Sequence, residues 1–271
     1  MRIWLTALVI AIALTSAHAE TCGGPEAPCA IEGGVYHVAL PEGDARPPVV
    51  LWLHGHGGSG AGAVKGFATN FTKRGYAVVA PTGQQTLLSK TDWSVSDGLD
   101  WPRDDVAFLK AVLADATSRF GLDRERVLVA GFSRGGSMAW ELACRAPEIG
   151  AAYAAVAGAF WEPMVAQCPS PVHLNHTHGF TDRLVPFEGR KVEFQGFAFH
   201  QGSVMKGIDV WREANGCMTS GAHQFRTDGG WEKSWHDCEE GSITLTLTQG
   251  GHGIPKGWTA RVLIWFESLQ E

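Results

Sequence analysis

One serine lies in a setting that can turn a hydroxyl group into a nucleophile. Ser133 is the centre of the run Gly131-Phe132-Ser133-Arg134-Gly135, which follows the apolar residues Val127-Leu128-Val129 and precedes a helix-forming stretch. A strand, a Gly-x-Ser-x-Gly turn and a helix in this order are typical of a nucleophile elbow. Glycine accounts for 34 of the 271 residues, so the five letters alone can arise by chance. The strand and the helix are what favour a nucleophilic Ser133.

The two glycines that flank this serine follow from the tightness of such a turn. The serine takes a strained backbone conformation, and a side chain at Gly131 or Gly135 would collide with the neighbouring strand or helix. The N-terminus of the following helix brings free N–H groups and the positive end of its dipole to the place where an oxyanion forms. We therefore expect the backbone N–H of Arg134 to be one oxyanion donor.

A glycine-rich loop can supply the second donor. The apolar run 49–53 is followed directly by His54-Gly55-His56-Gly57-Gly58-Ser59-Gly60. In a hydrolase built around a nucleophile elbow, the loop after the third strand carries the other oxyanion donor. A plain flexible turn would explain one or two of these glycines but not their density behind a core strand. We expect the N–H of His56 to be the second donor.

An acid and a base that could serve Ser133 follow it in the order Ser, Asp, His that this architecture uses. Asp182 lies just after an expected strand over 171–179, and His252 lies in a glycine-rich loop after the last expected strand, 242–248. The competing histidines precede the last strand, and the competing acids lie in an expected helix or in a Trp-rich segment: His200, His223, His236, Asp209, Asp228 and Asp237.

These residues predict acyl transfer through a covalent intermediate. His252 takes the hydroxyl proton of Ser133, Asp182 fixes the imidazole tautomer, and the serine attacks a carbonyl carbon. This chemistry needs neither a metal nor an organic cofactor. His176 and His178 share a strand face, but no third ligand can be assigned to them, so we expect structural or pocket-lining histidines and no metal site.

Alternation of strands and helices predicts an α/β fold with a mostly parallel central sheet and helices on both faces. The stretch 82–102 is expected to be a surface loop, and 217–238 to be irregular. The short connection between the strands over 152–159 and 171–179, where many lipases insert a lid, indicates an open site. The expected strands cover 35–40, 49–53, 76–80, 126–129, 152–159, 171–179 and 242–248, and the expected helices cover 63–74, 104–120, 134–144, 204–214 and 258–269.

The N-terminus has the pattern of an export signal. One basic residue and an apolar stretch are followed by Ala17-His18-Ala19, which predicts a signal peptide over 1–19 and a single catalytic domain over 20–271. The apolar stretch is too short for a membrane anchor that would remain after cleavage. A net charge of −6 without a basic cluster argues against nucleic acid as a partner.

Six cysteines lie in the exported part of the chain, and an even number in an oxidising compartment favours disulfides. Six cysteines allow fifteen pairings. Their closeness in sequence favours Cys22 with Cys29 and Cys217 with Cys238, which leaves Cys144 with Cys168.

Four motifs together resemble the secreted polyhydroxybutyrate depolymerase-like esterases, a group related to feruloyl and acetylxylan esterases. They are His54-Gly55-x-Gly57-Gly58, Gly131-Phe132-Ser133-x-Gly135-Gly136-Ser137-Met138, His178-Gly179-x-x-Asp182-x-x-Val185-Pro186-Phe187 and Gly250-Gly251-His252. The resemblance covers the chain from about residue 49 onward. It implies an α/β-hydrolase fold without a large lid and a triad of Ser133, Asp182 and His252. The positions of Cys144 and Cys168, and the run Asn215-Gly216-Cys217, also agree with that family.

The substrate is less sharply indicated. Members of the family act on polyesters, feruloylated xylan or small acyl esters, so we expect an ester substrate that can be polymeric. Arg134, His56 and Ile254 differ from the residues common in the family at the edge of the pocket. The Arg134 side chain either attracts a carboxylate-bearing acyl group or points to solvent. Trp161 and Trp93 are candidates to stack on an aromatic acyl group or a sugar, whereas core packing explains most other tryptophans.

Three functions fit the pattern to different degrees. The first is an exported serine hydrolase of carboxylic esters, in the periplasm or outside the cell. The second is a serine peptidase of the same fold, which usually carries an additional gating domain that this length does not accommodate. The third is a noncatalytic polymer-binding relative, which would be expected to lack a member of the triad.

Overall fold

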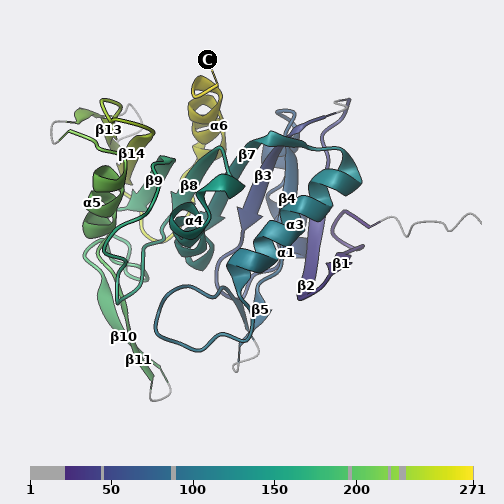
Figure 1. Ribbon diagram of the computed structural model, residues 1–271, viewed down its shortest axis with the longest axis horizontal. Helices are drawn as coiled ribbons and strands as arrows, with labels where there is room; N and C mark the ends of the chain where they lie inside the picture. The colour runs from purple at the N-terminus through teal and green to yellow at the C-terminus, as the bar shows by residue number, and fades with distance from the viewer. Residues whose placement is uncertain are drawn as a thin grey trace, which may run out of the picture.

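The apolar runs of the sequence form the middle of a ten-stranded sheet (Figure 1). The computed structural model describes residues 22–43, 46–86, 90–194, 197–218, 221–225 and 230–270, so the expected signal peptide lies outside the described residues. The strands are β1 (Cys29–Ile31), β2 (Gly34–Ala39), β3 (Pro48–Leu53), β4 (Ala77–Pro81), β5 (Gln84–Gln85), β6 (Thr91–Asp92), β7 (Asp123–Phe132), β8 (Ala152–Val156), β9 (His173–Gly179), β10 (Arg190–Phe194), β11 (Phe197–Gln201), β12 (Ala222–Phe225), β13 (Trp231–Trp235) and β14 (Ser242–Thr248).

The centre of this sheet is parallel, as the sequence predicts. Its order is β1-β2-β4-β3-β7-β8-β9-β14-β13-β12, and the strands from β4 to β14 pair in parallel. Antiparallel pairs extend the sheet at both edges, β2 and β1 on one side and β13 and β12 on the other. Because parallel strands point the same way, the loops that follow β3, β7, β9 and β14 leave the sheet at one edge.

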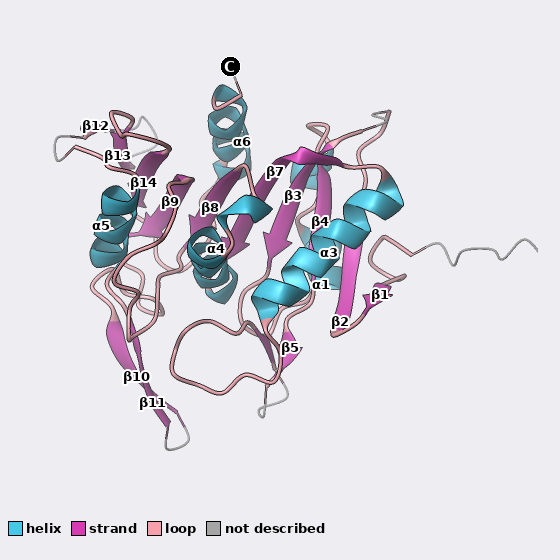
Figure 2. Cartoon of the chain, viewed as in Figure 1, coloured by secondary structure: helices cyan, strands magenta, loops and turns pink. Residues whose placement is uncertain are grey.

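Helices cover both faces of the sheet (Figure 2). They are α1 (Gly60–Gly66), α2 (Thr69–Thr72), α3 (Asp105–Phe120), α4 (Arg134–Arg145), α5 (Val204–Ala214) and α6 (Trp258–Ser268), with a 3-10 turn η1 over Pro147–Ile149. One apolar core contains side chains of α3, α4 and α5, and the other contains those of α1, α2 and α6. In β3, Val49 and Leu51 belong to the first core and Val50 and Trp52 to the second, which explains why the strand is apolar along its whole length.

The ends of α3 follow from its sequence. Asp104 is the N-cap, and its side chain accepts hydrogen bonds from the N–H groups of Val106 and Ala107. Gly121 ends the helix in a left-handed conformation with φ of 66°. The helix is therefore one residue shorter at its start than the expected 104–120.

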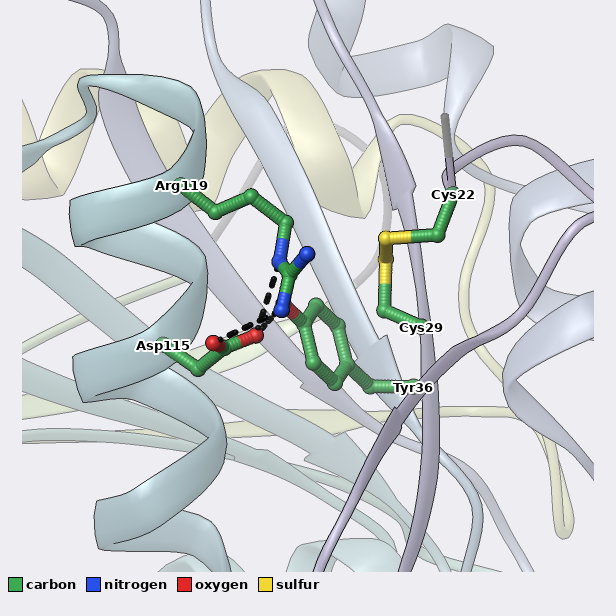
Figure 3. Close-up of a disulfide and its surroundings, with 5 residues drawn as sticks. All are labelled: Cys22, Cys29, Tyr36, Asp115 and Arg119. Carbon is green, nitrogen blue, oxygen red and sulfur yellow. Dashed lines mark hydrogen bonds and ion pairs between the residues drawn. A yellow bond between two sulfur atoms is a disulfide. The ribbon is translucent and has the colours of Figure 1, made fainter. Parts of the chain in front are cut away.

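The N-terminal edge of the sheet is fastened to α3 (Figure 3). The hydroxyl of Tyr36 in β2 donates a hydrogen bond to Asp115, which also accepts two bonds of 3.0 Å from Arg119. Burial raises the pKa of Tyr36, and the hydrogen bond to Asp115 raises it further. A disulfide between Cys22 and Cys29 lies beside this cluster and joins the first described residue to β1.

Two further disulfides join Cys144 to Cys168 and Cys217 to Cys238. All three pairs are the ones that closeness in sequence favours. The bond from Cys144 ties the C-terminal turn of α4 to the segment before β9. None of the helices in the described ranges is long and apolar enough to cross a membrane.

Several elements differ from those expected. The helix expected over 63–74 is two short helices, α1 and α2, and β8 ends at Val156 because Ala157 has a positive φ of 52°. The stretch 217–238 is not irregular, because it contains the antiparallel pair β12 and β13. A second hairpin, β10 and β11, projects from the edge of the sheet at which β5 also lies (Figure 2).

Candidate active site

Ser133 lies at the sharp turn between β7 and α4. Its φ of 57° and ψ of −122° are strained for a residue with a side chain, as expected for a nucleophile elbow. The backbone N–H of Ser133 donates to the carbonyl of Val156 in β8, with an N···O distance of 2.8 Å. The turn is thereby held against the neighbouring strand.

The glycines on either side of Ser133 are required by close backbone contacts. A Cβ atom at Gly131 would lie 2.1 Å from the carbonyl oxygen of Gly135, and one at Gly135 would lie 2.0 Å from the carbonyl oxygen of Leu53. Both distances are far below van der Waals contact, so each position excludes a side chain. This confirms the steric reason for the two glycines that the sequence predicts.

Ser133, His252 and Asp182 form a continuous hydrogen-bonded chain. The Ser133 Oγ lies 2.9 Å from Nε2 of His252, and Nδ1 of the same imidazole lies 2.7 Å from Oδ2 of Asp182. The structure therefore brings together the three residues that the sequence selects as nucleophile, base and acid, which are up to 119 positions apart. This geometry can pass a proton from the hydroxyl to an oriented imidazole.

The Asp182 carboxylate is buried and fully bonded. Its Oδ1 accepts hydrogen bonds of 2.9 Å from the backbone N–H groups of Leu184 and Val185, and Oδ2 faces His252. Its side chain has 0% exposed surface. These bonds fix the orientation of the carboxylate before any substrate is present.

The loops that carry the acid and the base are joined to each other. The N–H of Phe180 donates to the carbonyl of Thr248 at 2.8 Å, and the N–H of Thr181 donates to that of Gly250 at 3.1 Å. The hydroxyl of Thr181 donates to the same Gly250 oxygen at 3.0 Å. The parallel pairing of β9 with β14 thus continues beyond both strands, up to the two loops.

The neighbouring histidines of β9 are buried behind this site. Nε2 of His176 lies 3.0 Å from Nδ1 of His178, and Nε2 of His178 lies 2.8 Å from the carbonyl oxygen of Val185. Burial lowers the pKa of both imidazoles, that of His176 well below its ordinary value. Among the residues that the structure describes, no group of three or more His, Cys, Asp and Glu side chains could hold a metal ion.

The two expected oxyanion donors come from the loop after β3 and from the start of α4. In the loop after β3, the N–H groups of Gly57 and Gly58 are bonded to other carbonyls, whereas in the described part of the chain the N–H groups of His56 and Arg134 have no partner. A Cβ at Gly55 would lie 3.3 Å from the Cβ of Ser133, so this loop packs directly against the elbow.

The Arg134 side chain is neither directed to solvent nor free to bind a carboxylate group of a substrate. It is 10% exposed, and its Nε donates to Oδ1 of Asp92 at 2.9 Å while Nη2 donates to Oδ2 of Asp97 at 3.1 Å. Its guanidinium lies over the ring of Trp161, with 4.6 Å between the guanidinium carbon and the ring centroid. The expectation of an exposed side chain is therefore wrong, because two carboxylates bury and neutralise it.

Asp92 and Asp97 were not candidate site residues on the sequence alone. Both lie in 82–102, which shows no hydrophobic periodicity and is only partly a surface loop. Burial would raise the pKa of Asp92, but the hydrogen bond from His56 and the charge of Arg134 outweigh it and leave the pKa below its ordinary value. Knowing that Arg134 is buried would have been the signal to look for its carboxylate partners.

The two tryptophans expected to contact a substrate are both largely covered. Trp93 has no exposed surface, and its Nε1 donates to the carbonyl of His54 at 2.8 Å, so it supports the glycine-rich loop and offers no ring face to a substrate. Trp161 is 6% exposed and packs against Arg134 and Phe199. Its contact with a substrate stays a prediction.

A groove of about 670 Å³ opens at the base of the β10–β11 hairpin. The residues that line it come from the connection after β8, the loop before β10, the end of β11 and the start of α5. Phe187, on the wall of this groove, packs edge-on against the ring of His178, with 5.8 Å between the ring centroids. The hairpin is a narrow two-stranded arm and no large lid.

Comparison with known proteins agrees with this architecture. The family model described as "Putative esterase" matches residues 33–181. The "Probable feruloyl esterase C" of Aspergillus niger is 25% identical over 94% of this chain and 92% of its own length. The feruloyl esterase C of Emericella nidulans is 27% identical over 84% of this chain and 79% of its own length.

The fold is also found among solved structures. The acetyl xylan esterase from Aspergillus awamori aligns with a TM-score of 0.63 at 16% identity, over 87% of this chain and 94% of its own. The matched family model includes β3, the elbow and the strand before Asp182. The chain accordingly belongs to the "Putative esterase" family and is a carboxylic ester hydrolase of the α/β-hydrolase fold, related to feruloyl and acetylxylan esterases.

Proposed function

We propose that the enzyme hydrolyses its ester through an acyl-enzyme on Ser133. The observation that carries this proposal is the continuous chain of short hydrogen bonds from the Ser133 hydroxyl through His252 to Asp182. His252 accepts the hydroxyl proton as Ser133 attacks the carbonyl carbon, and then protonates the leaving alcohol. Water, activated by the same imidazole, releases the acid and restores Ser133.

We assign the backbone N–H groups of His56 and Arg134 as the donors to the oxyanion of the tetrahedral intermediate. Both N–H groups are free in the described part of the chain, and they come from the loop after β3 and from the start of α4. Such a donor is worth roughly 3 to 4 kcal/mol of transition-state stabilisation.

The substrate that we favour is a feruloyl ester on a polysaccharide. Its support is the similarity to the two fungal feruloyl esterases over most of both chains. Acetyl esters and polyhydroxyalkanoates are the competing substrate classes. A narrow hairpin in place of a large lid is compatible with a polymeric chain that passes through the site.

We also propose that the enzyme is exported and acts as one catalytic domain over 20–271. The support for export is the signal-like N-terminus together with three disulfides, which persist in oxidising compartments. The support for one domain is that the first and the last described strands, β1 and β14, belong to the same ten-stranded sheet.

Covalent labelling with a fluorophosphonate probe tests the nucleophile. We expect the wild-type enzyme to be labelled at Ser133 and the Ser133→Ala variant to be unlabelled and to lose esterase activity by at least about 10⁴-fold. The matched control is Ser137→Ala, one turn further along α4, which should still be labelled. An unlabelled wild type, or equal labelling of Ser133→Ala, would refute the assignment.

A panel of esters tests the substrate class. It compares methyl ferulate, acetylated xylan, short acyl esters and dispersed polyhydroxybutyrate by kcat/KM. We expect methyl ferulate to be the best of the four. A higher value for one of the others would replace the feruloyl assignment while leaving the triad in place.

A further inference from the structure

One carboxylate joins the side chains of the two residues to which we assign the oxyanion donors. Oδ2 of Asp92 lies 2.9 Å from Nδ1 of His56, and Oδ1 of the same group accepts from Nε of Arg134 at 2.9 Å. Each oxygen therefore has a different partner. Asp92 lies in β6, and its side chain and that of Arg134 are each 10% exposed, whereas the His56 side chain is 47% exposed. The bridge is therefore shielded from solvent at its Arg134 end.

Further hydrogen bonds hold Asp92 and its neighbour Thr91 in place. The N–H of Trp93 donates to Oδ1 of Asp92 at 2.9 Å. The carbonyl of Thr91, the residue before Asp92, accepts from the N–H of Gly57 at 2.8 Å. The hydroxyl of Thr91 donates to the carbonyl of Gly58. The two residues of β6 thus bond to three consecutive residues of the glycine-rich loop, His56, Gly57 and Gly58.

His54, at the start of the glycine-rich loop, is also held by the Nε1 of Trp93, but among the described residues Asp92 is the side chain that bonds to the His56 side chain. Gly57 has a left-handed φ of 73°, and glycines lower the cost of alternative backbone conformations. Arg134, in contrast, begins a helix and is held by the fold. A link from Arg134 through Asp92 to His56 therefore transfers the rigidity of α4 to the loop.

We propose that Asp92 is a positioning residue that holds the two oxyanion donors at a fixed distance from each other. This inference rests on the proposed function, because it takes the N–H groups of His56 and Arg134 as the donors. Two N–H groups stabilise one oxyanion only when both lie about 2.7 to 3.1 Å from the place that it occupies. Asp92 touches neither substrate nor reacting atoms and acts through His56 and Arg134.

The kinetic consequence is specific. The oxyanion exists in the transition state and not in the bound ester, so misplaced donors lower kcat and leave KM nearly unchanged. A general loss of packing would instead lower the amount of folded enzyme and change neither constant of the folded fraction. Because unfolded enzyme lowers the total rate without changing KM, kcat must be expressed per active site titrated with fluorophosphonate. A fall in this kcat indicates positioning, and a fall only in the number of titrated sites indicates stability.

The test compares Asp92→Ala with Asp97→Asn. Asp97 also binds the Arg134 guanidinium, at 3.1 Å, but the structure shows no bond from it to His56. For Asp92→Ala we expect kcat to fall about 10- to 100-fold with KM within about 3-fold of wild type. Affinity for a trifluoromethyl ketone, which forms an oxyanion on Ser133, should fall in parallel. Asp97→Asn should lower the melting temperature similarly but kcat much less.

Two further variants keep the test decisive if Asp92→Ala folds poorly. Asp92→Asn retains an oxygen for Arg134 and an N–H for the imidazole, so it should recover much of the lost kcat. The second test introduces Asp92→Ala into the His56→Ala variant. There it should lower kcat by a smaller factor than it does in the wild type, because the link to His56 is already absent.

The failure of this inference differs from that of the proposed function. If fluorophosphonate labels wild-type Ser133 but the Asp92 variants keep wild-type kcat and trifluoromethyl ketone affinity, Asp92 is structural and the inference is wrong. Additive effects of Asp92→Ala and His56→Ala would likewise overturn it. If wild-type Ser133 is not labelled, the proposed function itself fails.

Discussion

The strained turn at Ser133 depends on the absence of two Cβ atoms. Gly135 is the tighter of the two positions, because an added Cβ would lie 2.0 Å from the Leu53 carbonyl oxygen and 2.6 Å from that of His54. Neither neighbour is a flexible side-chain end, so a substitution must move the start of α4 or the end of β3. Stability and the position of the nucleophile are coupled at this residue.

We predict that Gly135→Ala destabilises the protein by about 3 kcal/mol, at the upper end for an overpacked site. A displaced elbow should also lower kcat at least about 100-fold. Urea unfolding and ester hydrolysis measure the two effects. Gly66→Ala is the matched control, because Gly66 ends α1, has no atom within 4 Å of an added Cβ, and should change stability by less than about 1 kcal/mol. Wild-type activity in Gly135→Ala would contradict the steric argument.

Single residues differ in how far the sequence predicts them. Ser133, Asp182 and His252 are predictable because each follows an expected strand, and the carboxyl ends of parallel strands meet at one edge. The burial of Arg134 is not predictable, because its partners Asp92 and Asp97 precede it by 42 and 37 positions, in a stretch without periodicity. Arginine is mostly exposed in proteins, which is why an exposed Arg134 is expected. This expectation fails where a carboxylate that is distant in the sequence is buried with the arginine.

Among the elements, α4 is fastened at both ends. Its N-terminus carries Ser133 at the elbow, and its last turn is bonded through Cys144 to Cys168 in the segment that leads to β9 and Asp182. This disulfide therefore connects α4, which follows Ser133, to the segment before β9, which leads to Asp182. The disulfide between Cys217 and Cys238 joins the two ends of the β12–β13 segment, and neither cysteine lies in α4 or in the segment before β9.

We predict that replacing Cys144 and Cys168 by serine lowers the free energy of unfolding by about 3 kcal/mol, from the closed loop of 24 residues. The disulfide between Cys217 and Cys238 closes a loop of 21 residues, so its replacement by two serines should cost a similar amount. Only the first pair of substitutions should also lower kcat, because of these two disulfides only the first ties α4 to the segment before β9. Urea unfolding and esterase assays on both variants measure this, and equal kcat in the two would count against the link.

The elements of the interior were predictable and those at the margins were not. Runs such as 49–53 are apolar throughout because both faces of the strand are buried, and such runs are visible in a sequence. The strands β10 to β13 carry many exposed polar residues and pair as hairpins, so their pattern resembles that of a loop. The expected helix over 63–74 is broken between α1 and α2, a boundary that periodicity does not locate.

At the scale of the whole molecule, several histidines are held in the neutral form. Burial is the largest cause that lowers the pKa of His37, His54, His173, His176 and His178. In the unfolded chain these imidazoles titrate near pH 6.5. A lowered pKa in the folded state means that the unfolded state binds more protons between the two pKa values. The neutral imidazoles therefore contribute their full stabilisation above pH 6.5, and this contribution to the free energy of unfolding is lost as the pH falls.

We predict that the free energy of unfolding decreases when the pH is lowered from 7.5 to 5.5. Urea unfolding at both values measures it. The His176→Gln variant isolates one contribution, because His176 is completely buried and its neutral form is replaced by a side chain that does not titrate. Between pH 7.5 and pH 5.5, the free energy of unfolding should decrease less for His176→Gln than for the wild type. A shift in the opposite direction would contradict the burial of a neutral imidazole.

The hydrogen bonds between the loops after β9 and β14 have a consequence for engineering. They make the acid and the base one rigid unit, whereas Ser133, Arg134 and Asp92 belong to another, built on β7, α4 and β6. Redesign of the second unit has to keep the contact between His252 and Ser133 and the link from Arg134 through Asp92 to His56. A library that varies the remaining residues of the second unit can therefore leave the bonded loops of Asp182 and His252 unchanged.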